Sequence, residues 1–111
     1  MSRPISKSEA LVLERVLAVG ALTPISQEVL ASIHSLHVTA ACKCGCATVW
    51  FGPDGDATIG KNIAEAVALS GRQKIVIIVW AQNGAIAGLE LVGYGKVPLP
   101  NSLTIRSYSD A

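Results

Sequence analysis

Charged residues are scarce in this chain. They make up 15% of its 111 residues, whereas about 25% is usual for a soluble domain. The formal net charge is +1 and Lys and Arg form no cluster, which argues against a surface that binds nucleic-acid phosphates. A strongly acidic surface is also missing. Because 50% of the residues are hydrophobic, the chain either buries an unusual fraction of itself or presents apolar surface to a partner.

Long apolar runs are missing as well. The longest, from Ile75 to Ala81, has the length of a strand and falls well short of the roughly 20 residues that a membrane span needs. The N-terminal residues contain no apolar signal-peptide core, so we expect no membrane association. Cysteine occurs only three times, at closely spaced positions. This pattern lacks a disulfide framework and fits a reducing compartment, so we expect a cytoplasmic protein.

The N-terminal part predicts a pair of helices. Ser6 and Glu9 form a capping box, and apolar residues then recur at helical spacing, which predicts a helix from Lys7 to Val19 that Gly20 ends. Thr23 as N-cap and Pro24 in the first turn predict a second helix. Its apolar face comprises Val29, Leu30 and Ile33.

The rest of the chain predicts strands. Apolar and polar residues alternate from Val38 to Phe51, which predicts one strand that ends at the turn formers 52–56. Residues 63–69 fit a strand better than a helical turn. Residues 74–81 form a strand that is apolar on both sides, and Asn83-Gly84 predicts a type I′ turn into a last strand, 85–94. Pro98 and Pro100 predict an irregular tail.

These elements predict one α+β domain over residues 1–111. Two N-terminal helices pack on one face of a mostly antiparallel sheet of about four strands, a meander with a C-terminal hairpin. Because the strand 74–81 is apolar on both sides, it needs cover on both. The chain's own loops, a second copy or a foreign partner could cover the second side.

Cys42, Cys44 and Cys46 alternate, so a single strand would direct all three thiols to one face. Three interpretations remain open. The thiols pack as small apolar groups beneath the helices, they bind a metal together with His34 or His37, or they carry redox chemistry. Thiols in a regular strand converge poorly on one ion, so we favour packing and expect no metal and no cofactor. For His34 and His37 we favour a position at the end of a helix, where the helix dipole favours a cationic imidazole.

Catalytic patterns are weak. No segment pairs two carboxylates for acid–base work, and the spacing of cysteine, histidine and aspartate singles out no nucleophilic triad. The turn 52–56 lacks the ligands of a calcium loop, and residues 93–96 do not match a phosphate loop. Residue types that anchor protein interfaces are present instead, namely Trp50, Trp80, Tyr94, Tyr108, Arg72 and Arg106. Both tryptophans could equally fill the core.

The order of these motifs resembles a set of small bacterial proteins of unassigned activity. The resemblance runs from about Leu13 onward and is carried by the Cys42–Cys46 strand, the Leu89-Glu90 hairpin and the Pro98–Pro100 tail. It implies a fold and a bacterial origin but no catalytic residue. In size and style the chain is also similar to immunity proteins of contact-dependent inhibition and related toxin systems, a similarity of class and not of motif.

We therefore expect a non-enzymatic, cytoplasmic protein-binding module, most simply a bacterial immunity protein that neutralises a cognate toxin. The expected contact residues are Trp80, Asn83, Glu90, Tyr94 and Arg106. The alternatives are a thiol-based metal or redox protein and a small homodimer that pairs its apolar sheet face with itself. Neither nucleic acid nor a membrane is an expected partner.

Overall fold

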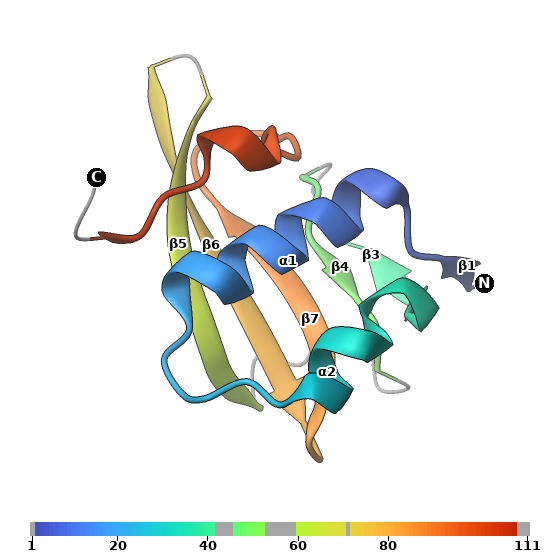
Figure 1. Ribbon diagram of the computed structural model, residues 1–111. Helices are drawn as coiled ribbons and strands as arrows, with labels where there is room; N and C mark the ends of the chain where they lie inside the picture. Colours follow the sequence, from blue (N-terminus) through green and yellow to red (C-terminus); the bar gives the residue numbers. More distant parts are fainter. Residues whose placement is uncertain (1, 42–45, 53–59, 71, 109–111) are drawn as a thin grey trace.

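A layer of helices packs on one side of an antiparallel sheet in the computed structural model (Figure 1). The structure describes residues 2–41, 46–52, 60–70 and 72–108. The helices are α1 (Lys7–Gly20), α2 (Gln27–Ser32) and the 3₁₀ turns η1 (Ile33–Ser35) and η2 (Ser102–Thr104). The strands are β1 (Arg3–Pro4), β2 (His37–Val38), β3 (Ala40–Ala41), β4 (Val49–Trp50), β5 (Lys61–Ser70), β6 (Gln73–Gln82) and β7 (Ala85–Val92).

The α+β class predicted from the sequence is confirmed. The strand count was too low, because the main sheet of the described residues has five strands in the order β3-β4-β7-β6-β5. β1 and β2 form a separate two-stranded sheet. None of the helices within the described ranges combines the length and the apolar character needed to cross a bilayer.

α1 begins at the predicted capping box. The Ser6 hydroxyl accepts a hydrogen bond from the Glu9 N–H at 3.1 Å, and the Glu9 carboxylate accepts one from the Ser6 N–H at 2.9 Å. Both bonds satisfy backbone donors that a helix start otherwise leaves without partners. The predicted apolar face is buried in the core and comprises Ala10, Leu13, Val16 and Leu17. Burial of each of its larger side chains stabilises the fold by about 1.5–3 kcal/mol.

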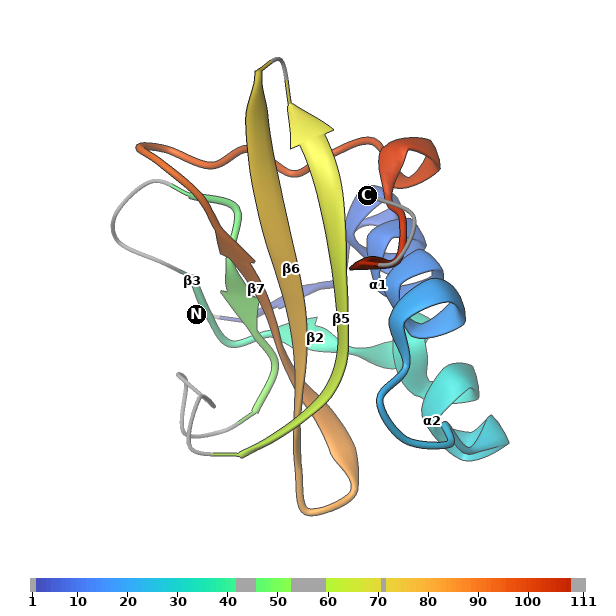
Figure 2. The same ribbon diagram turned by 90° about the vertical axis from the view of Figure 1, so that its left-hand side faces the viewer.

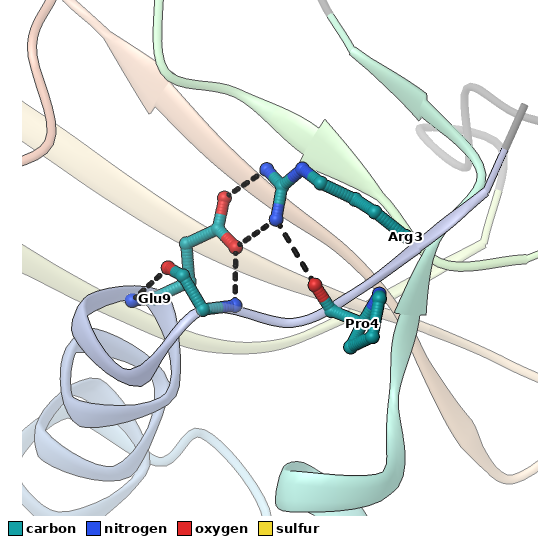
Figure 3. Close-up of polar contacts among 4 residues, drawn as sticks. Arg3, Pro4 and Glu9 are labelled. Carbon is teal, nitrogen blue, oxygen red and sulfur yellow. Dashed lines mark hydrogen bonds and ion pairs between the residues drawn. The ribbon is translucent and has the colours of Figure 1, made fainter.

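The same carboxylate ties the N-terminal strand to α1. Arg3 on β1 donates two hydrogen bonds to Glu9, at 2.9 and 2.8 Å, and a third to the carbonyl of Pro4 at 3.2 Å (Figure 3). Burial alone would raise the pKa of Glu9, but the hydrogen bonds from Arg3 and Ser6 outweigh burial and hold that pKa below its usual value. Glu9 is therefore ionised and buried in the folded protein at neutral pH.

α2 begins later than the sequence indicates. Ser26, and not Thr23, is the N-cap, and its hydroxyl accepts from the Val29 N–H at 3.2 Å. Upstream, the Leu22 N–H donates to the Ile63 carbonyl of β5 at 2.9 Å. This bond to β5 keeps the connection extended through Leu22, and the helix begins only at the Ser26 cap.

Gly20 ends α1 as predicted, but for a different reason. A Cβ atom at this position would lie 2.7 Å from the carbonyl carbon of Glu65 and even closer to its oxygen. The next residue, Ala21, forms an antiparallel bridge with Ala64. Glycine is needed here because the end of the helix touches the backbone of β5, and not because the chain adopts a left-handed conformation.

The predicted strand from Val38 to Phe51 is wrong. Ala40 pairs with Trp50 and Ala41 with Val49 in antiparallel register, so the chain reverses direction between β3 and β4. The alternation of small residues continues across this reversal, and for that reason the pattern alone could not reveal it. Cys42 and Cys44 lie outside the described residues, and so do residues 53–56 of the predicted turn.

The C-terminal hairpin matches the prediction closely. β5, β6 and β7 are neighbours in the sheet, and β5 confirms the strand that was favoured for residues 63–69. Asn83 and Gly84 adopt φ angles of +54° and +80°, the left-handed conformations that a type I′ turn requires at both central residues. The tail is irregular as predicted, apart from η2 and a bridge between Arg106 and Val67.

Candidate partner-binding face

The two sides of the sheet are covered unequally. On one side of β6, Ile75, Ile77 and Val79 are fully buried. Their neighbours in register, such as Ala66 on β5 and Leu91 on β7, are buried with them, because directly opposed residues point to the same side of a sheet. α1, α2 and η2 all lie along this side (Figure 2).

The other side carries the alternate residues of the same strands. We call it the open face and define it by Trp50, Asn62, Val76, Ile78, Trp80, Glu90 and Val92. Val76, Ile78 and Trp80 are only half-buried, and Val92 is 46% exposed. No helix of the described chain lies on this side (Figure 2). The prediction that both sides of β6 are apolar is confirmed, and among the described elements no helix covers its second side.

Trp50 and Trp80 form a small aromatic cluster on the open face. Both are paired with Gly88, Trp50 from β4 and Trp80 from β6. A Cβ atom at Gly88 would overlap the six-membered ring of Trp50, so the glycine leaves room for the indole. Trp50 is 7% exposed and packs with the buried residue Ala87. Trp80 packs against these two residues and is itself half-buried. The cluster therefore has a buried ring and an accessible one.

Glu90 is hydrogen-bonded to the accessible ring. The indole N–H of Trp80 donates to the Glu90 carboxylate at 2.9 Å. This bond fixes the orientation of the indole before any partner binds, which lowers the entropy cost of binding. A carboxylate can accept about four hydrogen bonds, so Glu90 keeps capacity for donors of a partner.

A β-bulge between Trp80 and Ala81 places Glu90 on the open face. Next to the turn, Gln82 pairs with Ala85 and Ala81 with Ile86, but beyond the bulge Trp80 pairs with Gly88 and Ile78 with Glu90. Without this shift of one residue, Glu90 would oppose Ile77 and enter the core, since a one-residue slip moves every side chain to the other side. The bulge thus keeps Leu89 and Leu91 inside and the carboxylate outside.

Asn62 adds an incompletely bonded polar group beside Trp80, its partner in register. The side-chain amide of Asn62 donates to Glu65. Its carbonyl oxygen Oδ1 is buried and receives no hydrogen bond from the described residues. A buried acceptor without a donor costs about 1–3 kcal/mol, so this position lowers the stability of the fold.

The structure brings only two of the five expected contact residues together. Trp80 and Glu90 meet on the open face, whereas Asn83 lies exposed at the β6–β7 turn. Tyr94 follows the opposite end of β7 and is 89% exposed. Arg106 lies on the outer edge of β5, where its backbone pairs with Val67. The expected residues are thus spread over separate parts of the surface.

Trp50 and Asn62 were not among the expected contacts. Trp50 had been noted as an anchor type, but its place beside Trp80 depends on the pairing of β4 with β7. The sequence does hold one signal, because Gly88 interrupts an otherwise apolar strand, and a glycine inside a strand often marks the close approach of another group. No comparable signal identifies Asn62.

The thiol interpretations concern residues that the structure describes only in part. Cys46 is half-buried, and its thiol lies 3.5 Å from the Thr48 hydroxyl. Thr48 is buried, and its hydroxyl accepts from the Leu91 N–H at 2.9 Å, so it joins the segment before β4 to β7. The described residues contain no group of three or more His, Cys, Asp or Glu side chains placed to hold a metal.

The histidines occupy different elements. His34 lies in η1, directly after α2, and its Nε2 is 2.7 Å from the Glu14 carboxylate of α1. His37 lies on β2, opposite Pro4. The prediction that both sit at the end of a helix is therefore wrong for His37, because the chain becomes extended directly after η1.

Comparisons of the chain with known protein families, with curated proteins and with solved structures found no match.

Proposed function

We propose that this protein is a non-enzymatic protein-binding module that recognises another protein through the open face. The observation that carries the proposal is the unequal cover of β6. Its first side is fully buried beneath α1, whereas the equally apolar second side is only half-buried among the described residues. Accessible apolar side chains around an aromatic anchor are typical of interaction surfaces.

The polar groups on the open face support recognition of a protein. Glu90 holds the Trp80 indole through its N–H and keeps capacity for further donors. It is an acceptor that can fix the orientation of a partner, while Val76 and Ile78 supply apolar contact. An apolar centre with a few polar groups that set orientation is the usual composition of a protein interface.

In its specific form, the proposal is that the partner is a bacterial toxin and that the chain is the cognate immunity protein. A cytoplasmic immunity protein needs a stable domain and an apolar-aromatic binding face, and it needs no catalytic centre. The near-neutral charge of the chain means that apolar contact, and not electrostatic attraction alone, would provide the affinity.

The test is protection of a susceptible bacterium from the toxins encoded beside the gene of this protein. The wild-type chain should restore growth and bind the purified toxin domain. Ile78→Lys should weaken binding at least about 100-fold, as at a central interface position. Leu11→Lys is the matched control, because Leu11 is an exposed apolar residue on α1, on the opposite side of the sheet. It should change binding less than about twofold.

Equal protection by the wild type and by folded Ile78→Lys would contradict the open face as the binding surface. Lack of protection by the wild type would contradict the toxin partner. If light scattering then showed a dimer that Ile78→Lys dissociates, a second copy of the chain would be the occupant of the open face.

A further inference from the structure

Two segments from distant parts of the chain pair with the outer edge of β5. Ala21 forms a bridge with Ala64, and the Leu22 N–H donates to the Ile63 carbonyl at 2.9 Å. Farther along, Val67 exchanges two backbone hydrogen bonds with Arg106, at 2.9 and 2.8 Å. This cover ends at Val67.

Leu69 provides the next outward-pointing backbone groups. Alternate residues of an antiparallel strand direct their N–H and C=O to the same neighbouring strand. Because the backbone groups of Val67 bond away from β6, the N–H and C=O of Leu69 also point away from β6. In a continued ladder Thr104 would oppose Leu69, but Thr104 belongs to η2, which turns the chain away. No residue in the described ranges gives Leu69 a backbone partner on this edge.

A cleft of about 330 Å³ lies at this position, between β5 and η2. Its apolar walls include Val67, Leu69 and Leu103. Leu69 is 65% exposed and Leu103 is 84% exposed, so both present apolar surface to solvent. The cleft therefore combines apolar walls with a pair of Leu69 backbone groups that have no partner on this edge among the described residues.

The charged residues that line this cleft within the described ranges are cations. They are Lys74 and Arg106, and no described Asp or Glu lines the cleft. Arg15 adds a third cation nearby, since its Nε donates to the carbonyl of Ile105 at 3.2 Å. A ligand that bears a carboxylate would therefore be favoured over a neutral or cationic one.

We propose that this cleft binds an extended peptide segment as an added strand. The peptide backbone pairs with the N–H and C=O of Leu69, and an apolar side chain of the peptide packs between Leu69 and Leu103. A carboxylate, from an acidic side chain or a chain end, lies against Lys74 and Arg106. Strand addition of this kind takes affinity from backbone bonds and specificity from the side-chain pockets. The site lies at the β5 edge of the sheet and shares no residue with the open face, although Leu69 and Lys74 point to the same side of the sheet as Val76. It therefore goes beyond the proposed function.

The test is selection from a display library of random heptapeptides with free C-terminal carboxylates, using the full folded chain as bait. We expect enrichment of peptides with alternating apolar residues and a carboxylate. In the complex, hydrogen exchange at the Leu69 amide, followed by NMR, should slow at least tenfold. Replacing the peptide carboxylate by an amide should weaken binding at least tenfold.

Variants separate the proposed contacts. Leu69→Asp, and the double change Lys74→Glu with Arg106→Glu, should each weaken binding at least tenfold. Lys96→Glu is the matched control, because Lys96 is an exposed cation that does not line the cleft, and it should change binding less than twofold. Circular dichroism and thermal unfolding would establish that each variant is folded.

Three results would overturn the proposal. The first is failure to enrich any peptide. The second is binding that Leu69→Asp or peptide amidation leaves unchanged. The third is a Leu69 amide that is already protected in the peptide-free wild type, which would mean that this edge is occupied.

Discussion

Arg3 and Glu9 meet in a two-point ion pair, with nitrogen–oxygen distances of 2.9 and 2.8 Å, that joins β1 to the first turn of α1. Glu9 is buried while Arg3 is half exposed. The pair thus holds the N-terminal strand against the helix, and through β2 it also fixes the chain that follows η1.

This ion pair makes stability depend on pH. Because the pKa of Glu9 is lowered in the folded state, its contribution is complete above the unfolded pKa of about 4.3 and is lost as pH falls through the folded pKa. At pH 7 Glu9→Gln should lower the free energy of unfolding by about 1–2 kcal/mol. Urea denaturation at several pH values should show this difference shrinking below about pH 4.

Glu28→Gln is the control, because Glu28 is an exposed carboxylate in the first turn of α2. It should change stability by less than about 0.5 kcal/mol. A difference between Glu9→Gln and the wild type that stays constant from neutral to acid pH would contradict the ionised, hydrogen-bonded state of Glu9.

Gly20→Ala should be destabilising, although glycine-to-alanine changes inside helices usually stabilise. The new Cβ would overlap the Glu65 carbonyl, and overpacking of this kind typically costs about 1–3 kcal/mol. Ala18→Gly, at an exposed position of the same helix, should cost only the helix propensity of about 1 kcal/mol. Thermal unfolding of each variant measures the loss from steric overlap in Gly20→Ala and the loss of helix propensity in Ala18→Gly. A stabilised Gly20→Ala variant would disprove the close contact between α1 and β5.

Trp50 and Gly88 should be energetically coupled. Gly88→Ala places a methyl group against the Trp50 ring and should cost about 1–3 kcal/mol in the wild type. In a Trp50→Leu background the cost should be smaller, since the ring is gone. A double-mutant cycle by urea denaturation should give a coupling of at least about 0.5 kcal/mol. Strict additivity would show that the two residues do not touch.

Trp80→Ala and Tyr94→Ala test the expected contact residues. Trp80 is half-buried and bonded to Glu90, so its truncation should cost about 2 kcal/mol, roughly half the loss for a fully buried ring. The variant should remain folded. Tyr94 is 89% exposed, and its truncation should change stability by less than about 0.5 kcal/mol. Trp80→Ala should weaken partner binding, whereas Tyr94→Ala, outside the open face, should change it less than about twofold. Unfolding of Trp80→Ala would instead assign Trp80 to the core.

Elements specified by local signals could be predicted from the sequence. The capping box at Ser6 starts α1, and the Asn83-Gly84 turn sets the β6–β7 hairpin, because each depends on residues close together in the chain. The start of α2 was misplaced because Thr23 was chosen as the N-cap, whereas Ser26, three residues later, caps the helix. The choice between them depends on the pairing of Leu22 with the distant residue Ile63.

The candidate site was only partly predictable. Trp80 and Glu90 could be chosen by residue type, but their hydrogen bond depends on the bulge at Trp80. A regular ladder from the turn would direct Glu90 into the core. The reversal between β3 and β4, which places Trp50 beside the hairpin, depends on long-range pairing that the alternation of small residues does not encode.

The pairing of β5 with the segments around Ala21 and Arg106 has a consequence for solubility. A strand edge with free N–H and C=O groups can recruit the same strand from another molecule, and such recruitment can lead to fibrils. In this fold the chain's own segments, and not charged side chains, block most of that edge. A chain cut short before Arg106 would therefore expose β5, and it would be expected to aggregate even though the remaining strands could still form.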